Sequence, residues 1–379
     1  MKISLYSVRE RLKRMDPILL LCSIVPSMFS LLTLWGCREA YAGGTKRVIV
    51  QFAAVLLGVM FTFVVANFDY EYVVNKLFWG FFAFSVILLV LVLTPLGTSE
   101  GSNQSYIVIP FLPINLQPSE FVKVTFIVTF AKHLDVVKAR INHPKSLLGL
   151  ALHAGLIIVL ILLEKDLGVA LVYIAFVAIM LWGAGLNLWY FFGVIVALVL
   201  ASPYLWSILE PHQQERILYG FRPELDPLGA GMHAMTSKAA LASGGLFGKG
   251  ISGAEAYLNM PTKGTYTDFI FAIFGEMFGF VACLVLILLY ALLIIRIIHI
   301  ARTHRKDLGA FICIGVAGTL FAQIIENIGM CLAMLPVVGI TLPFMSYGGS
   351  SMLTNFVLLG LVHSVNANRN KYYFERESV

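Results

Sequence analysis

Ten separate runs of about 20 mostly apolar residues limit what this chain can fold into more than any other feature of its sequence. A helix of that length crosses the hydrocarbon core of a bilayer, where every backbone polar group must be hydrogen-bonded within the protein. Because 59% of the 379 residues are apolar and only 13% are charged, a soluble globular chain is excluded. We therefore predict an all-α integral membrane protein with about ten transmembrane helices, forming one polytopic domain over residues 1–379. The expected spans are 17–36, 48–67, 77–95, 117–134, 146–163, 168–185, 187–206, 269–297, 309–334 and 342–365.

The orientation of these spans follows from lysine and arginine, which accumulate in cytoplasmic loops. Alternate loops on one side hold 17 of these residues, and those on the other side hold nine, of which five lie in one long loop. We therefore expect both termini in the cytoplasm and loop 207–268 outside. The net charge of +6 suits contact with anionic membrane lipids, and we do not expect nucleic acid as a partner. The 17 residues are Lys2, Arg9, Arg11, Lys13, Arg14, Lys76, Lys132, Lys138, Arg140, Lys145, Arg296, Arg302, Arg305, Lys306, Arg369, Lys371 and Arg376.

Loop 207–268 is the largest segment predicted outside the membrane, and it is basic and rich in glycine. Backbone N–H groups and cations such as Lys249 and Lys263 in such a loop can bind phosphate. A flexible connection with a surface helix over residues 235–246 explains the same composition equally well.

Charged residues within the apolar spans indicate a polar site, because each costs about 3 kcal/mol at mid-bilayer unless it is paired or hydrated. Glu120 and Lys123 fall on one helix face at i, i+3, where they can pair or point into a shared cavity. Asp166 follows Glu164 and Lys165 in a short turn between two spans, where a solvated turn is the simpler interpretation.

Asp268 stands where the long outer loop meets the eighth span. It or Thr267 could simply cap that helix. Near the end of the chain, helix-breaking glycines and prolines and several hydroxyls between Asn327 and Ser351 lie within or beside apolar segments. Breakers at membrane depth are tolerated where they face protein or water, so a broken helix or re-entrant turn lining a polar site is predicted there, with close helix packing as the alternative.

Several of these segments resemble the signatures of one family in order along nearly the whole chain. They are QPSE at 117–120 with Lys123, DLG at 166–168, SGGLFGKG at 243–250, TDFIFA at 267–272, LPF at 342–344 and SYGGSS at 346–351. Together with ten spans they are similar to the SEDS family, whose members include RodA, FtsW and SpoVE, and the short tails look most like RodA. One departure is residues 101–107, which read GSNQSYI where members commonly carry an Arg-Trp pair.

The resemblance implies a peptidoglycan glycosyltransferase in the bacterial cytoplasmic membrane. Its substrate would be lipid II, and its partner a class B penicillin-binding protein that crosslinks the product. The family's essential acid corresponds to Asp268, which would act as a general base or would hold a divalent cation, Mg²⁺ or Mn²⁺. We expect substrate binding by Glu120, Lys123, Asp166, Lys249, Lys263 and Ser350.

The implied reaction is a single inverting displacement, because the donor sugar is α-linked to pyrophosphate and the product is β-linked. Two other functions remain open from the sequence. Polar residues at membrane depth also occur in a lipid II flippase or transporter, although no inverted repeat stands out. An inactive scaffold that only positions its partner is the third alternative.

Overall fold

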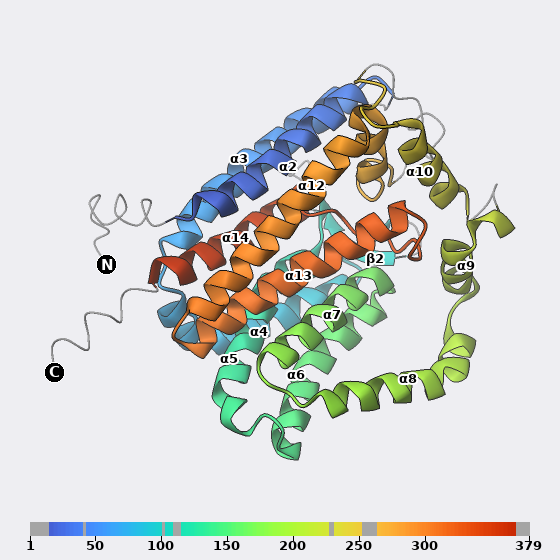
Figure 1. Cartoon of the computed structure of the whole chain (residues 1–379). Coiled ribbons are helices and arrows are strands. Elements are labelled where there is room, and N and C mark those ends of the chain that lie inside the picture. Colours follow the sequence, from blue (N-terminus) through green and yellow to red (C-terminus); the bar gives the residue numbers. More distant parts are fainter. Residues whose placement is uncertain are drawn as a thin grey trace.

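The computed structural model describes residues 15–40, 43–100, 103–108, 115–226, 231–251 and 264–368, and most of them lie in helices packed into a bundle (Figure 1). Each of the ten predicted spans overlaps one long helix, so the all-α membrane fold is confirmed. These helices are α2 (Pro17–Gly36), α3 (Gly44–Ala66), α4 (Tyr70–Val92), α5 (Pro118–Val137), α6 (Pro144–Leu163), α7 (Leu167–Gly183), α8 (Leu188–Ile208), α12 (Ile270–Thr303), α13 (Asp307–Cys331) and α14 (Gly349–Asn368).

Six of the described helices are long and apolar enough to cross a membrane by length and composition alone: α2, α3, α4, α6, α12 and α13. Helices α7 and α8 are apolar but yield shorter apolar stretches, and α5 and α14 fall outside both groups. The polarity of α5 and α14 has a structural reason, because their polar side chains are buried against neighbouring helices. Hydropathy alone therefore understates the spans that lie inside the bundle.

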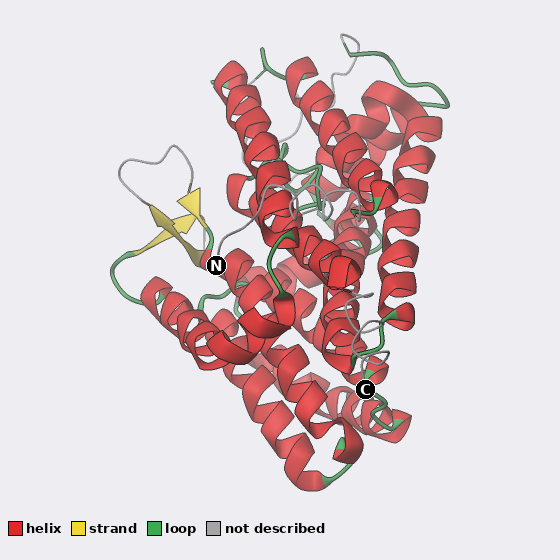
Figure 2. Ribbon diagram, turned by 90° about the vertical axis from the view of Figure 1, so that its left-hand side faces the viewer, coloured by secondary structure: helices red, strands yellow, loops and turns green. Residues whose placement is uncertain are grey.

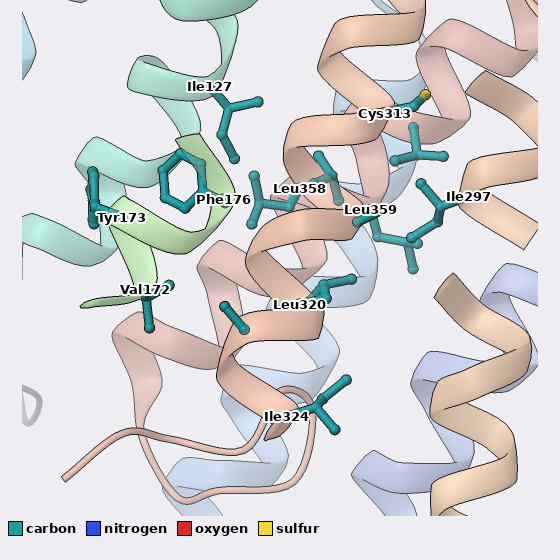
Figure 3. Close-up of a cluster of buried hydrophobic side chains, with 14 of the residues drawn as sticks. Ile127, Val172, Tyr173, Phe176, Ile297, Cys313, Leu320, Ile324, Leu358 and Leu359 are labelled. Carbon is teal, nitrogen blue, oxygen red and sulfur yellow. The ribbon is translucent and has the colours of Figure 1, made fainter. Parts of the chain in front are cut away.

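The core of the bundle is built around α13, which packs against α5, α7, α12 and α14. Figure 3 shows its Leu320 among apolar side chains from these helices, including Phe176 of α7 and Leu358 of α14. All five cysteines are free and buried, so they serve as packing residues. Helix α8 differs, because none of its described side chains is buried and it is splayed away from the bundle (Figure 1).

Two outer segments depart from the sequence predictions. Three short antiparallel strands, β1 (Gly97–Glu100), β2 (Asn103–Val108) and β3 (Asn115–Leu116), form a small sheet beside the helices in the loop before α5 (Figure 2). The predicted surface helix is α10 (Met232–Ser243), which follows α9 (Pro211–Phe221) and the short helix η2 (Pro223–Leu225). This helix is attached to the bundle, because it packs against α12 and α13 and Ser237 donates to the Cys331 carbonyl at 2.7 Å.

Contacts between distant helix ends define two edges of the bundle. At one edge, Asp16 before α2 pairs with Arg296 of α12 at 2.6 Å, and its backbone N–H donates to His363 of α14. At the same edge, Lys306 before α13 pairs with Glu71 of α4. The other edge holds the start of α12 and the turn before α14, where Ser346 donates to the Thr267 carbonyl. We call the first the basic edge and the second the outer edge.

We expect the outer edge to face the cell exterior and the basic edge the cytoplasm. Exposed Lys238 of α10 and exposed Arg140 after α5 can each be replaced by cysteine, while the five native cysteines are buried. In intact cells, a membrane-impermeant maleimide should label Lys238→Cys and leave Arg140→Cys unlabelled until the cells are permeabilised. Labelling in the reverse pattern would invert the orientation.

Candidate functional site

The Asp268 side chain lies in a narrow slot of the outer edge. A Cβ atom built on Gly264 or on Gly339 would stand 3.3 Å from Asp268 Oδ2, and both glycines have positive φ, at 85° and 73°. Helix α12 begins after Phe269 and receives no hydrogen bond from a side-chain cap. The interpretation of Asp268 or Thr267 as a helix cap is therefore wrong.

The backbone around Asp268 is held by the side-chain amide of Asn327 in α13. The two hydrogens of Asn327 Nδ2 are donated to the carbonyls of Asp268 and Ile340, each at 2.7 Å. Asn327 is fully buried. One amide thus joins the segment before α12 to the segment after α13, and this fixes where the Asp268 carboxylate points.

The segment between α13 and α14 is a turn that lies at the level of the site. The tenth predicted span began at residue 342, but α14 starts only at Gly349, because Phe344 adopts a φ of 62° and ends any regular helix. Buried Gln51 of α3 stabilises this turn by donating to the Ser346 carbonyl and accepting from the Gly348 N–H. The predicted re-entrant turn is therefore present and faces protein.

Arg47 of α3 is a cation that contacts the segment before α12 and that the sequence analysis did not select. Its guanidinium lies 4.4 Å from the centre of the Tyr266 ring, a cation–π contact two residues before Asp268. Tyr266 is also held in place, since its carbonyl accepts from the Tyr347 N–H and the two rings pack edge to face. The basic pair at residues 46–47, just before an apolar span, was the available sequence signal.

Two predicted residues, Asp166 and Ser350, meet on either side of Gln117. The Gln117 side-chain amide donates to Asp166 at 3.4 Å, and its backbone N–H donates to Ser350 Oγ at 3.3 Å. Asp166 also caps α7 by accepting from the Val169 N–H. This group connects to the Asp268 slot, because a Cβ on Gly168 would stand 2.6 Å from the carbonyl oxygen of residue 338, immediately before Gly339.

The turn that carries Asp166 is not the solvated turn that composition suggested. Glu164 is 0% exposed and Asp166 is also buried, whereas Lys165 faces water and pairs with Glu210 of α9. Burial raises the pKa of Glu164 to about 9, and the neighbouring Asp166 charge adds to the shift. Glu164 is therefore a neutral carboxylic acid at pH 7.

Glu120 and Lys123 form a buried ion pair at 2.7 Å, with side chains 4% and 2% exposed. Of the two alternatives left open by the sequence, direct pairing is confirmed. Glu326 of α13 is close enough to Lys123 to interact with it electrostatically, and the sequence analysis missed this third charge although it lies within an apolar span. Lys123 is buried and interacts with the two acids Glu120 and Glu326. It therefore supports the site from within the bundle.

Lys249, a predicted phosphate contact, is engaged with a buried acid. Its ammonium lies 2.9 Å from Glu276 of α12, and its backbone N–H donates to the Glu276 carbonyl at the same distance. The contact occurs where α12 is interrupted at Gly279, which has a φ of 78°. The last predicted cation, Lys263, lies outside the described residues.

A metal site made by the protein alone is not found within the ranges that the structure describes, where no group of three or more His, Cys, Asp and Glu could hold an ion. Mg²⁺ commonly needs only one or two carboxylates when substrate phosphates and water complete its shell. Asp268 thus fits a shared site of that kind, and the cation stays a prediction.

Removing either charge of the Glu120–Lys123 pair should destabilise the fold. Glu120→Ala or Lys123→Ala leaves a charge unpaired in low dielectric, which costs about 3–5 kcal/mol, and should lower the yield of folded protein and its unfolding temperature in detergent. The matched control is Lys138→Ala, which breaks an ion pair with Asp307 whose side chains are 45% exposed and should cost below about 1 kcal/mol. Equal losses in all three variants would show that Glu120 and Lys123 behave as a surface pair.

Glu164 should make stability depend on pH above the usual carboxylate range. Its folded pKa of about 9 exceeds the ordinary 4.5, so the folded state keeps a proton that the unfolded state releases, and stability falls as pH rises from 4.5 to 9. Glu164→Gln preserves a neutral group and removes this dependence. As the pH rises from 5 through 7 to 9, the unfolding temperature of Glu164→Gln should increasingly exceed that of the wild type. The unfolding temperature of Glu210→Gln, which changes an exposed carboxylate, should follow that of the wild type. A constant difference across pH would contradict the assignment.

Comparisons with known proteins agree with this architecture. The family model described as cell cycle protein FtsW/RodA/SpoVE matches residues 14–371. The chain is 32% identical to peptidoglycan glycosyltransferase MrdB of Escherichia coli K12 over 365 residues, which cover 94% of each chain. It is 33% identical to stage V sporulation protein E of Bacillus subtilis over 324 residues, or 82% of this chain and 84% of the relative.

Solved structures show the same fold. A chain from the structure titled "Structural coordination of polymerization and crosslinking by a peptidoglycan synthase complex" aligns with a TM-score of 0.80 and 29% identity, covering 94% of this chain and 98% of that one. The rod shape determining protein RodA of Thermus thermophilus aligns with a TM-score of 0.69 and 25% identity, covering 94% and 97%. The chain therefore belongs to the FtsW/RodA/SpoVE family of multi-pass membrane proteins.

Proposed function

We propose that this chain is a peptidoglycan glycosyltransferase that polymerises lipid II into glycan strands at the outer face of the bacterial cytoplasmic membrane. The observation that carries the proposal is the slot at the outer edge, where the Asp268 carboxylate lies between Gly264 and Gly339 and where the Arg47 guanidinium contacts the ring of Tyr266. The names of the relatives, which are similar over 94% of the chain, support the same activity.

The reaction needs a base and a cation on the two sides of one sugar carbon. The 4-hydroxyl of one lipid II attacks the anomeric carbon of the growing chain, its O–H proton passes to Asp268, and the bond to undecaprenyl pyrophosphate breaks with inversion. General-base assistance of this kind contributes roughly 10²–10⁴ in rate. Because Asn327 and the two glycines fix Asp268, the carboxylate is oriented before substrate binds.

The pyrophosphate that leaves carries the charge that cations must stabilise. We assign this role to Arg47, which would replace the arginine that the family commonly carries before the fourth span. Lys263 is a second candidate. A divalent cation shared between Asp268 and the pyrophosphate would supply further neutralisation.

The remaining predicted residues position the site. Lys249 holds the outer loop to the interrupted α12, and the Glu120–Lys123 pair fixes the first turn of α5 beneath Gln117, Asp166 and Ser350. We infer that substrate contacts Gln117, which is hydrogen-bonded to Asp166 and Ser350. Lys123 then supports this group from within the bundle through its ion pair with Glu120.

The partner that we propose is a class B penicillin-binding protein, which would crosslink the strands as they form. Support comes from the match to a chain of a peptidoglycan synthase complex whose title couples polymerisation with crosslinking. We also propose both termini in the cytoplasm, in accord with the grouping of Asp16, Arg296 and His363 at the basic edge.

Asp268→Asn should abolish polymerisation and spare the fold. The amide keeps the size of the side chain but removes the base, so we expect a loss of roughly 10²–10⁴ in the rate of glycan formation from purified lipid II. Because no side chain caps α12, expression and unfolding temperature should match the wild type. Gel analysis of glycan products in detergent measures the rate.

The control is Asp307→Asn, an acid 45% exposed at the opposite edge, which should polymerise normally. Near-normal activity of Asp268→Asn would remove Asp268 from the reaction. A wild-type protein that moves lipid II across vesicles, yet makes no glycan even with its partner, would establish the flippase alternative.

A further inference from the structure

A second cavity lies far from the Asp268 slot, at the basic edge between α4, α5 and α6. Its volume is about 530 Å³. The lining residues are Asn75, Phe78, Trp79, Phe82, Lys132, His133, Val136 and His153. Neither the proposed reaction nor any sequence motif uses them.

One wall of this cavity is apolar and open to lipid. Phe78, Trp79 and Phe82 stack edge to face along α4, and the Trp79 side chain is 76% exposed. Val136 of α5 faces the same space and is 61% exposed. Since a helix rises 1.5 Å per residue, the wall from Asn75 to Phe82 is about 10 Å long, which is enough to hold part of an acyl chain.

The opposite wall carries a directed chain of hydrogen bonds. Thr129 Oγ1 donates to the Phe126 carbonyl at 3.1 Å, so it accepts from His153 Nε2 at 3.4 Å. In neutral His153 the other ring nitrogen is then unprotonated, and it accepts from His133 Nδ1 at 3.1 Å. The chain ends at His133, which lines the cavity.

Cations line and flank the mouth of the cavity. Lys132 lines the cavity and pairs with Asp135 at 3.3 Å, both side chains being partly exposed. In the turn after α5, Arg140 is exposed and Lys138 pairs with Asp307. Basic pockets between transmembrane helices at the cytoplasmic side suit anionic lipid headgroups.

We propose that this cavity binds an anionic phospholipid of the inner leaflet. Its phosphate contacts Lys132, and an acyl chain lies along Phe78, Trp79 and Phe82. A phospholipid is the occupant that matches both walls, because it joins an anionic phosphate to an apolar chain within the membrane plane. Binding clamps α4 against α5 and α6 and does not depend on the proposed polymerase activity.

The test uses the full chain, delipidated in detergent, with phosphatidylglycerol, phosphatidylcholine and inorganic phosphate as separate probes. Native mass spectrometry and thermal unfolding should show retention of phosphatidylglycerol and a raised unfolding temperature. Lys132→Gln should weaken that binding about fivefold, the factor expected for one cation beside an anionic headgroup. Trp79→Ala changes an exposed side chain, so the protein should fold, yet both phospholipids should bind severalfold more weakly.

The matched control is Lys145→Gln, which removes an exposed lysine of the same edge outside the cavity and should bind phosphatidylglycerol like the wild type. Unchanged binding by Lys132→Gln would overturn the proposal. Equal binding of phosphatidylcholine would also overturn it, by reducing the cavity to an apolar groove. Stabilisation by inorganic phosphate alone would overturn it in favour of a free-anion site.

Discussion

The side-chain amide of Asn327, which is fully buried, satisfies two backbone carbonyls, and the outer edge is organised around it. Irregular backbone at membrane level is tolerated only where protein or water completes its hydrogen bonds. Here Asn327 of α13 and Gln51 of α3 do so for the segments before α12 and before α14. The slot that holds Asp268 exists because these segments can leave helical geometry without exposing unpaired groups to lipid.

A buried polar layer beneath that slot explains why α5 and α14 are less apolar than their neighbours. The Glu120–Lys123 pair costs desolvation energy that its direct contact only partly offsets. Such a pair is weak evidence for stability, but it holds the first turn of α5 in one orientation. Gln117 at that turn then reaches both Asp166 and Ser350. In our proposal this rigidity serves catalysis, because donors and acceptors that are already oriented need no reorganisation when charge develops.

The outer edge and the basic edge differ in their chemistry. The outer slot combines a carboxylate with Arg47 and suits a reaction on a lipid-linked sugar. The inner cavity combines aromatic rings with Lys132 and His133 and suits a lipid that stays bound. Helices α4 and α5 run between the two edges, and each is packed against the central α13 or its neighbours. Lipid bound at the basic edge would therefore stabilise helices whose other ends lie near the outer edge.

Sequence alone determined the membrane class and the ten helices, because apolar length follows directly from bilayer thickness, and lysine–arginine placement predicts their orientation. Local spacing also predicted that Glu120 and Lys123 share a face. Contacts between distant segments decided the rest. Lys249 pairs with Glu276, and Arg47 contacts Tyr266, although these residues are separated by tens to hundreds of positions. Glu164 is buried by neighbouring helices. No local sequence pattern specifies these contacts. Asp268 was identified by its resemblance to a family motif, but only the tertiary structure showed that it does not cap α12 and that Gly264, Asn327 and Gly339 hold it.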